Sequence, residues 1–229
     1  MAERERPILF SGPMVRAILE GRKTKTRREV KPRPAPNQPH DGGTTWHFDT
    51  KRGVHVPCGS VGHLTVKEKA GLACPYGRRG DRLWVRETWA PHADELRHYS
   101  ATTPASASIY YQADGGLWGD DDMRAGRGWF VPTGDPHVNR WHPSIHMPRW
   151  ASRLTLEVTA VHVERLQRIS DADCRAESCE GDFSGDIPFG YSTPCDQFQR
   201  LWVSINGPDS WSLNPWVWVV EFRRVEAAR

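Results

Sequence analysis

The sequence predicts an α+β fold: a small mixed β-barrel with two or three helices packed outside it. Most apolar segments are short, alternate with polar residues and end at turns, which is typical of strands. The last segment, 216–224, is apolar on both faces, as expected for a strand that is central or lies inside a closed barrel. The chain shows neither an internal repeat nor a strand–helix–strand rhythm, which also favours the barrel.

The N-terminal part predicts a strand, a helix and an extended stretch. The apolar run Pro7–Phe10 indicates a strand. A helix is expected to begin at Pro13, a residue suited to the first helical position, and to end near Gly21. The segment Gly21–Arg28, called the basic segment below, therefore leaves a helix end and enters an extended stretch from Thr26 to Val30.

Three further strands are predicted in the middle of the chain, at 63–69, 82–87 and 108–112. In the second of them, Leu83 and Val85 share one face, and Trp84 and Arg86 share the other. The remaining residues of this region lack periodicity. We therefore expect a single domain spanning 1–229, with long insertions at about 31–79 and 90–149.

The C-terminal third has the most regular pattern. Alternation between Leu154 and Val163 predicts a strand. Ser170 begins a capping-box pattern, which predicts a short helix through Glu177. A second helix is expected to be capped by Asp196 and stopped by Asn206-Gly207-Pro208. Its apolar stripe consists of four residues at helical spacing: Phe198, Leu201, Trp202 and Ile205.

Charge is distributed unevenly along the chain. The formal net charge is only +3, but residues 22–33 hold seven basic residues against the single acid Glu29. Residues 171–186 hold six acids against Arg175. A local basic stripe is the electrostatic pattern expected where a protein contacts phosphate.

Composition also indicates the compartment. The charged start of the chain is unlike a signal peptide, and no segment approaches 18 apolar residues. The five cysteines show no framework spacing, so we expect free thiols and a cytoplasmic protein without a membrane partner. Cys58 and Cys74, with His55 and His63, match no common zinc spacing, so neither a metal nor another cofactor is expected.

Several motifs together resemble the ASCH family. The predicted helix followed by Gly21-Arg22-Lys23-Thr24-x-Thr26-x-Arg28 is similar to the N-terminal signature of that family. Later segments resemble its middle, late and closing strands: Gly80-Asp81-x-Leu83-x-Val85, Leu154–Thr159 followed by Ile169-Ser170 and Glu177, and Trp218–Phe222. Order and rough spacing agree over about half of the chain, and the whole resembles the longer, Trp-rich forms encoded by bacteriophages and prophages.

The resemblance implies a PUA-like β-barrel and a nucleic-acid or modified-nucleoside ligand. Most members of the family are inferred to bind RNA or nucleotides. We therefore expect the basic segment to contact phosphate through four cations: Arg22, Lys25, Arg27 and Arg28. Trp84 and Arg86 are the candidates for stacking a base, since aromatic and guanidinium planes stack on nucleobases.

The resemblance also leaves an enzymatic alternative open. One bacterial branch of the family hydrolyses N-acetylcytidine without a metal, and its catalytic residues correspond here to Lys23, Thr26 and Glu177. A Thr hydroxyl needs a base to become a nucleophile, and a neutral Lys23 could serve as that base. Both hypotheses require the basic segment and Glu177 to line one cavity. A third possibility, a phage nuclease or host-interaction protein, has no sharper support in the sequence.

Overall fold

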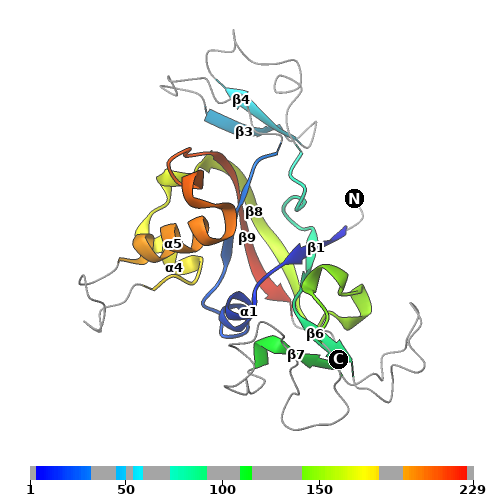
Figure 1. Ribbon diagram of the computed structural model, residues 1–229. Coiled ribbons are helices and arrows are strands. Elements are labelled where there is room, and N and C mark those ends of the chain that lie inside the picture. Colours follow the sequence, from blue (N-terminus) through cyan, green and yellow to red (C-terminus); the bar gives the residue numbers. More distant parts are fainter. Residues whose placement is uncertain are drawn as a thin grey trace, which may run out of the picture. The chain divides into compact units, whose positions relative to one another are not determined.

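The computed structural model describes residues 4–31, 45–49, 54–58, 73–91, 109–114, 141–180 and 193–225. These residues confirm the α+β class, with one five-stranded sheet, two two-stranded sheets and few helices (Figure 1). The order of strands in the larger sheet is β1-β5-β8-β9-β2. Their bounds are Glu5–Leu9 for β1, Arg82–Arg86 for β5, Thr155–Arg165 for β8, Trp216–Val225 for β9 and Lys25–Glu29 for β2.

The larger sheet is mixed and, within the described residues, open. Hydrogen bonds from Arg82 N to Arg4 O and from Phe10 N to Arg86 O make β1 and β5 parallel, whereas β2 runs antiparallel to β9. Strands β1 and β2 form the two edges, so the described strands do not close into the expected barrel. Strand β9 lies between β8 and β2 in the sheet, and most of its residues are buried on both faces. This burial explains why its sequence is apolar on both faces.

The described chain divides into two compact units. The first contains the described residues within Met1–Arg4, Gly21–Arg82 and Glu157–Arg223. The second contains those within Glu5–Glu20, Leu83–Leu156 and Arg224–Arg229. The single domain spanning 1–229 stays a prediction. The strand expected at 63–69, and much of both expected insertions, lie outside the described residues.

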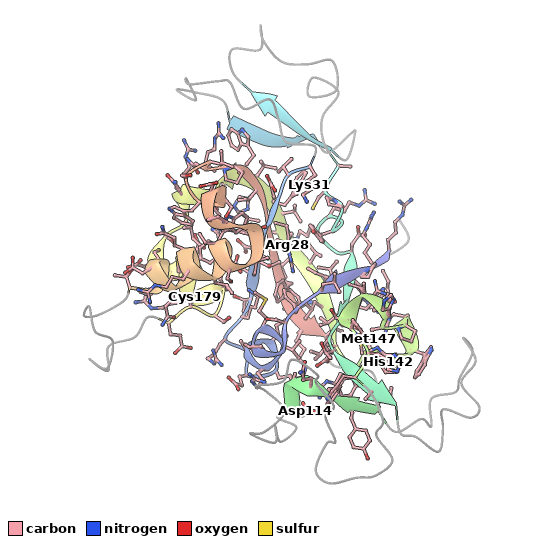
Figure 2. The ribbon with its side chains drawn as sticks, viewed as in Figure 1. Arg28, Lys31, Asp114, His142, Met147 and Cys179 are labelled. Atoms are coloured by element: carbon pink, nitrogen blue, oxygen red, sulfur yellow. The ribbon has the colours of Figure 1, made fainter. Side chains whose placement is uncertain are left out.

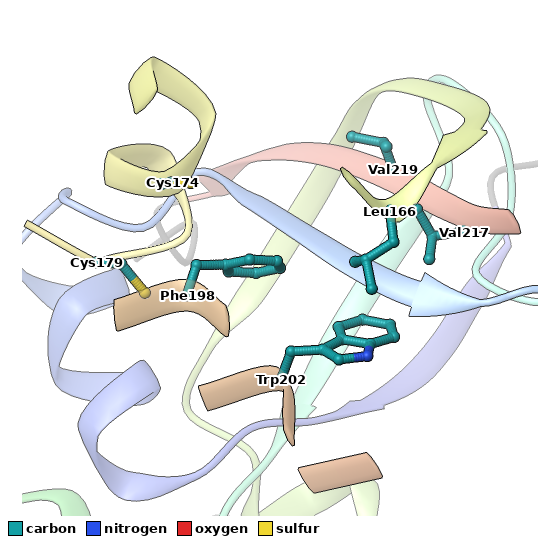
Figure 3. Packing of buried hydrophobic residues seen from close by; sticks show 7 residues of the cluster. All are labelled: Leu166, Cys174, Cys179, Phe198, Trp202, Val217 and Val219. Carbon is teal, nitrogen blue, oxygen red and sulfur yellow. The ribbon is translucent and has the colours of Figure 1, made fainter. Parts of the chain in front are cut away.

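The core of the first unit is formed by β9 and two helices, α4 (Asp171–Ala176) and α5 (Pro194–Asn206). Figure 1 shows α4 and α5 side by side, next to β2. Phe198 and Trp202 of α5 are one helical turn apart and belong to the same buried cluster as Val217 and Val219 of β9 (Figure 3). Ile205 is 56% exposed, so the apolar stripe of α5 is buried as far as Trp202 and does not extend to Ile205, contrary to the prediction.

The ends of both helices follow from their capping residues. Ser170 accepts a hydrogen bond from Asp173 N and so caps α4, as predicted, while Glu177 is the C-terminal cap. Helix α5 begins earlier than predicted, since its cap is Thr193 rather than Asp196. Thr193 and Asp196 form a reciprocal capping box, and Pro194 occupies the first turn, where its missing N–H costs nothing.

A hairpin replaces part of the first predicted insertion. Strands β3 (Thr45–Asp49) and β4 (Val54–Cys58) pair antiparallel, in a region that was expected to be irregular. The correction has a local cause, because Thr, Trp, Phe and Val in these two segments are strong strand formers.

In the second unit, helix α1 (Gly12–Leu19) begins with Pro13 in its first turn and buries Val15 and Ile18, as predicted. Strands β6 (Trp89–Pro91) and β7 (Ile109–Tyr111) form the second small sheet. The buried carboxylate of Glu87 is held by two hydrogen bonds from Arg153, of 3.0 and 3.1 Å. Short 3-10 turns complete the described elements: η1 (Gln112–Asp114), η4 (Ser144–His146), η5 (Arg149–Ala151), η6 (Leu166–Arg168) and η7 (Pro208–Ser210).

Candidate functional site: a buried ion-pair cluster

Lys23 and Glu177 form an ion pair that is almost completely withdrawn from water. Lys23 Nζ donates to Glu177 Oε2 at 2.6 Å and to the backbone carbonyl of the same residue at 3.0 Å. The two side chains are 0% and 4% exposed, respectively. The structure thus brings together two residues that are 154 positions apart in the sequence.

Backbone hydrogen bonds explain how these two residues meet. Gly21 has a φ of 76°, a conformation that glycine adopts without strain, and it redirects the chain after α1. Thr24 N then donates to Ala176 O at the end of α4, and Thr24 O accepts from Phe222 N of β9. Lys23 is therefore fixed beside the C-terminal cap of α4, where Glu177 lies.

Arg27 extends the ion pair into a network. Its guanidinium donates to Glu164 Oε1 at 2.7 and 3.0 Å, lies 3.3 Å from Asp173 and donates to Glu177 Oε1 at 3.5 Å. The Arg27 side chain is only 1% exposed, and its guanidinium carbon is 6.0 Å from the centre of the Phe198 ring. Glu177 thus has a cation at each of its two carboxylate oxygens.

Lys25 completes the network at its more exposed side. Its Nζ lies 2.8 Å from Asp173 and 3.1 Å from Glu221. The hydrogen bond to Asp173 outweighs partial desolvation and raises the pKa of Lys25. Burial alone would raise the pKa of Asp173, but hydrogen bonds from Lys25 and Ser170 and the charge of Arg27 lower it to about 2.

We call this network the ion-pair cluster; its members are Lys23, Lys25, Arg27, Glu164, Asp173, Glu177 and Glu221. The cluster contains three cations and four carboxylates, so it carries no excess of positive charge. Arg22, next to it, lies 3.4 Å from the exposed Glu180. Three of the cations expected to contact phosphate, Arg22, Lys25 and Arg27, therefore already have carboxylate partners within the protein.

The three acids that sequence reasoning missed are Glu164, Asp173 and Glu221. The acidic run 171–186, which complements the basic one, was a usable signal for Asp173. Glu164 and Glu221 lie on β8 and β9, and their pairing with the basic segment depends on the order of strands in the sheet.

Thr26 is directed away from Arg27. Side chains alternate along β2, so Lys25 and Arg27 share the face toward α4, whereas Thr26 and Arg28 share the other face. Thr26 is 3% exposed and lies opposite Val220 of β9. Arg28 follows on β2, and Lys31 lies just beyond the end of that strand (Figure 2).

Trp84 and Arg86 belong to the second unit. The Arg86 guanidinium carbon is 5.3 Å from the centre of the Trp84 ring, and that of Arg149 is 6.0 Å from it. Arg86 Nε donates to the carbonyl of Met147 (Figure 2) at 3.1 Å, and its Nη2 donates to the carbonyl of Ile145. Two guanidinium groups therefore already lie close to the ring that was expected to stack a base.

Within the described residues, no three His, Cys, Asp or Glu side chains are arranged to hold a metal ion. The side chains of His55 and Cys58, and the whole of His63, lie outside the described part. None of the described helices has both the length and the apolar character that a membrane crossing requires.

Comparisons with known proteins add no relative. A scan against protein-family models finds no match, and searches of the curated proteins and of the solved structures find no significant similarity. The likeness to the ASCH family therefore depends on the sequence motifs alone.

Proposed function

We propose that this chain is an ASCH-type protein with a PUA-like fold that binds a nucleic acid or a modified nucleoside at the ion-pair cluster. Within that class, the cluster favours a nucleoside or single base over an extended polyanion. The observation that carries the proposal is the buried pair of Lys23 and Glu177, with Arg27 on the second carboxylate oxygen.

Energetics support a functional role for this pair. Removing two charges from water costs several kcal/mol per ion, and their mutual attraction often does no more than offset that cost. A buried ion pair is therefore a weak source of stability. A buried ion pair that contributes little to stability is a candidate for a functional role, although structural networks also contain such pairs.

The chemistry of the pair suits a base edge. An amine donor beside a carboxylate acceptor complements a neighbouring acceptor and donor, such as the carbonyl and amino groups of cytosine. Such hydrogen bonds are stronger in a water-poor site than in water. Phosphate recognition instead needs uncompensated cations, and Lys23, Lys25 and Arg27 all have carboxylate partners.

A thermal-shift screen at two salt concentrations tests the choice of ligand. The panel contains cytidine, N-acetylcytidine, other modified nucleosides and short RNA and DNA oligonucleotides. We expect stabilisation by one or more nucleosides that changes little with salt. Stabilisation by oligonucleotides alone, falling steeply as salt rises, would indicate a phosphate-binding surface and contradict the proposal.

The enzymatic alternative is supported by the same contact. Lys23 and Glu177, two of the three residues implied by the resemblance to the N-acetylcytidine hydrolases, are hydrogen-bonded to each other. The third, Thr26, shares its face of β2 with Arg28 rather than with Arg27. The hydroxyl would have to attack an acyl carbon presented from that face, and Lys23 could take its proton only after passing one of its own protons to Glu177.

Acetate release from N-acetylcytidine, measured by chromatography, tests this alternative. The expected result is turnover by the wild type and by Thr24→Ala, whose altered side chain is exposed and two residues from the proposed nucleophile. Thr26→Ala and Lys23→Ala should both be inactive. Full activity of Thr26→Ala would exclude Thr26 as nucleophile, and an inactive wild type would exclude this reaction.

A further inference from the structure

Two cysteines of the first unit face each other across its helices. Cys174 Sγ of α4 and Cys195 Sγ of α5 are 2.6 Å apart, and both residues are free thiols. A disulfide bond is about 2.05 Å long, so the two sulfurs need to approach by only about half an ångström more. The five cysteines show no framework spacing, so the sequence alone gives no reason to pair these two.

We propose that Cys174 and Cys195 form an oxidation site, a dithiol that a peroxide converts into a disulfide bond. The proposal goes beyond the proposed function and does not depend on it. The proposal depends on the short distance between the two sulfur atoms, since most pairs of cysteines in a fold lack the geometry for a disulfide bond.

The environments of the two thiols assign them different roles. Cys195 is partly exposed, in the first turn of α5, whereas Cys174 is 0% exposed within the core cluster. Peroxide therefore reaches Cys195 first. Cys179, the third cysteine of this region, is 4% exposed in the same cluster, and Figure 3 shows it beside α5.

The reaction balances in two steps. The Cys195 thiolate attacks one peroxide oxygen, the O–O bond breaks, and the departing hydroxide takes up the proton that the thiol released, which gives a sulfenic acid and one water. The Cys174 sulfur then attacks the sulfenic sulfur, the S–S bond forms, the S–O bond breaks, and the hydroxide leaves as a second water. Two thiols lose two electrons in total, and one peroxide molecule accepts them.

The rate of this reaction should rise with pH. Burial raises the pKa of both thiols, so the reactive thiolate is scarce near neutrality and becomes more abundant in alkaline solution. The groups that face the two thiols are Cys179 and Arg27 around Cys174, and Asp171 and Asp196 around Cys195. The carboxylates add to the effect of burial, whereas Arg27 opposes it.

The bond would have a consequence for the ion-pair cluster. Cys174 directly follows Asp173 on α4, and Glu177 is the cap of the same helix. A disulfide would tie this short helix to α5 and so fix the two carboxylates that α4 and its cap contribute to the cluster.

The test treats the full-length protein with hydrogen peroxide, alkylates the remaining thiols and maps disulfide-linked peptides by mass spectrometry without reduction. Two of the five thiols should be lost, and one cross-linked peptide should join Cys174 to Cys195. Dithiothreitol in a parallel tube shows that the oxidant is sufficient. If both cysteines remain open to alkylation while dithiothreitol is consumed, the proposal fails.

Matched variants identify the bond. In Cys195→Ser, a mild change at a partly exposed position, Cys174 should remain reduced. Cys179→Ser and Cys74→Ser replace other buried cysteines and should leave the cross-link at its wild-type yield. A cross-linked peptide that joins Cys174 mainly to Cys179 would overturn the assignment.

Discussion

At the scale of single residues, the pairing of Lys23 with Glu177 gives a different environment from the one that the sequence suggests. In the sequence, the charged residues next to Lys23 are the cations Arg22 and Lys25. In the structure, Lys23 Nζ is hydrogen-bonded to a carboxylate from a distant element. The sequence thus shows which charged residues a motif contains, but it does not show which residue each of them pairs with in the fold.

The coupling within this pair is measurable. Glu177→Gln should destabilise the protein by about 3 kcal/mol, because it leaves a buried ammonium without its carboxylate. The double variant Lys23→Met/Glu177→Gln should lose much less than the sum of its two single variants. Urea unfolding of the four proteins gives the values. Additivity to within about 0.5 kcal/mol would mean that the two residues are not coupled.

Asp173 gives a prediction about pH. Its pKa is lowered to about 2, so its ionised form stabilises the fold above its unfolded pKa of about 3.9, and that stabilisation is lost as pH falls toward 2. Asp173→Asn should therefore cost about 1–2 kcal/mol at pH 7, a value reduced for partial exposure, and almost nothing near pH 2.

Denaturant unfolding across this pH range checks the prediction. Asp171→Asn is the matched control, since it removes a carboxylate from the same first turn of α4 at a more exposed position. It should show a smaller loss at pH 7. Equal losses for the two variants at every pH would assign the effect to the helix dipole rather than to Lys25 and Arg27.

At the scale of elements, interiors were easier to predict than ends. The helix at α1, the strands β5, β8 and β9, and the cap of α4 follow from periodicity and capping residues. Helix α5 begins one turn earlier than predicted, because both Thr193 and Asp196 are good capping residues and only the folded backbone selects between them. Because side chains alternate along β2, Thr26 and Arg27 point to opposite faces of the strand. The sequence motif, in which they are neighbours, does not show this separation.

The cap of α5 can be tested directly. Thr193→Ala should lower the free energy of unfolding by about 1 kcal/mol, because it leaves Asp196 N without its side-chain acceptor. Thermal unfolding followed by circular dichroism measures the change. Thr24→Ala, at an exposed position outside any helix, should have almost no effect. Equal values for the two variants would argue that the capping box does not stabilise α5.

At the scale of the whole molecule, the α+β class was predictable and the closure of the sheet was not. Alternation identifies strands, but their order depends on long-range pairing, and the described strands leave β1 and β2 as edges. The charge balance around the basic segment depends on the same long-range pairing. The carboxylates that neutralise Lys23, Lys25 and Arg27 come from residues 137 or more positions away, so local counting gives a basic stripe where the fold forms a balanced cluster.

Isothermal titration calorimetry tests the central claim, that the buried ion pair is a ligand site, most directly. The nucleoside selected by the thermal-shift screen is titrated into the wild type, into Lys23→Met/Glu177→Gln and into Arg22→Gln/Glu180→Gln. The last variant removes an ion pair of the same charges from the exposed neighbours. We predict that binding is lost in the first double variant and kept in the second. Wild-type affinity in Lys23→Met/Glu177→Gln would place the ligand elsewhere and contradict the account.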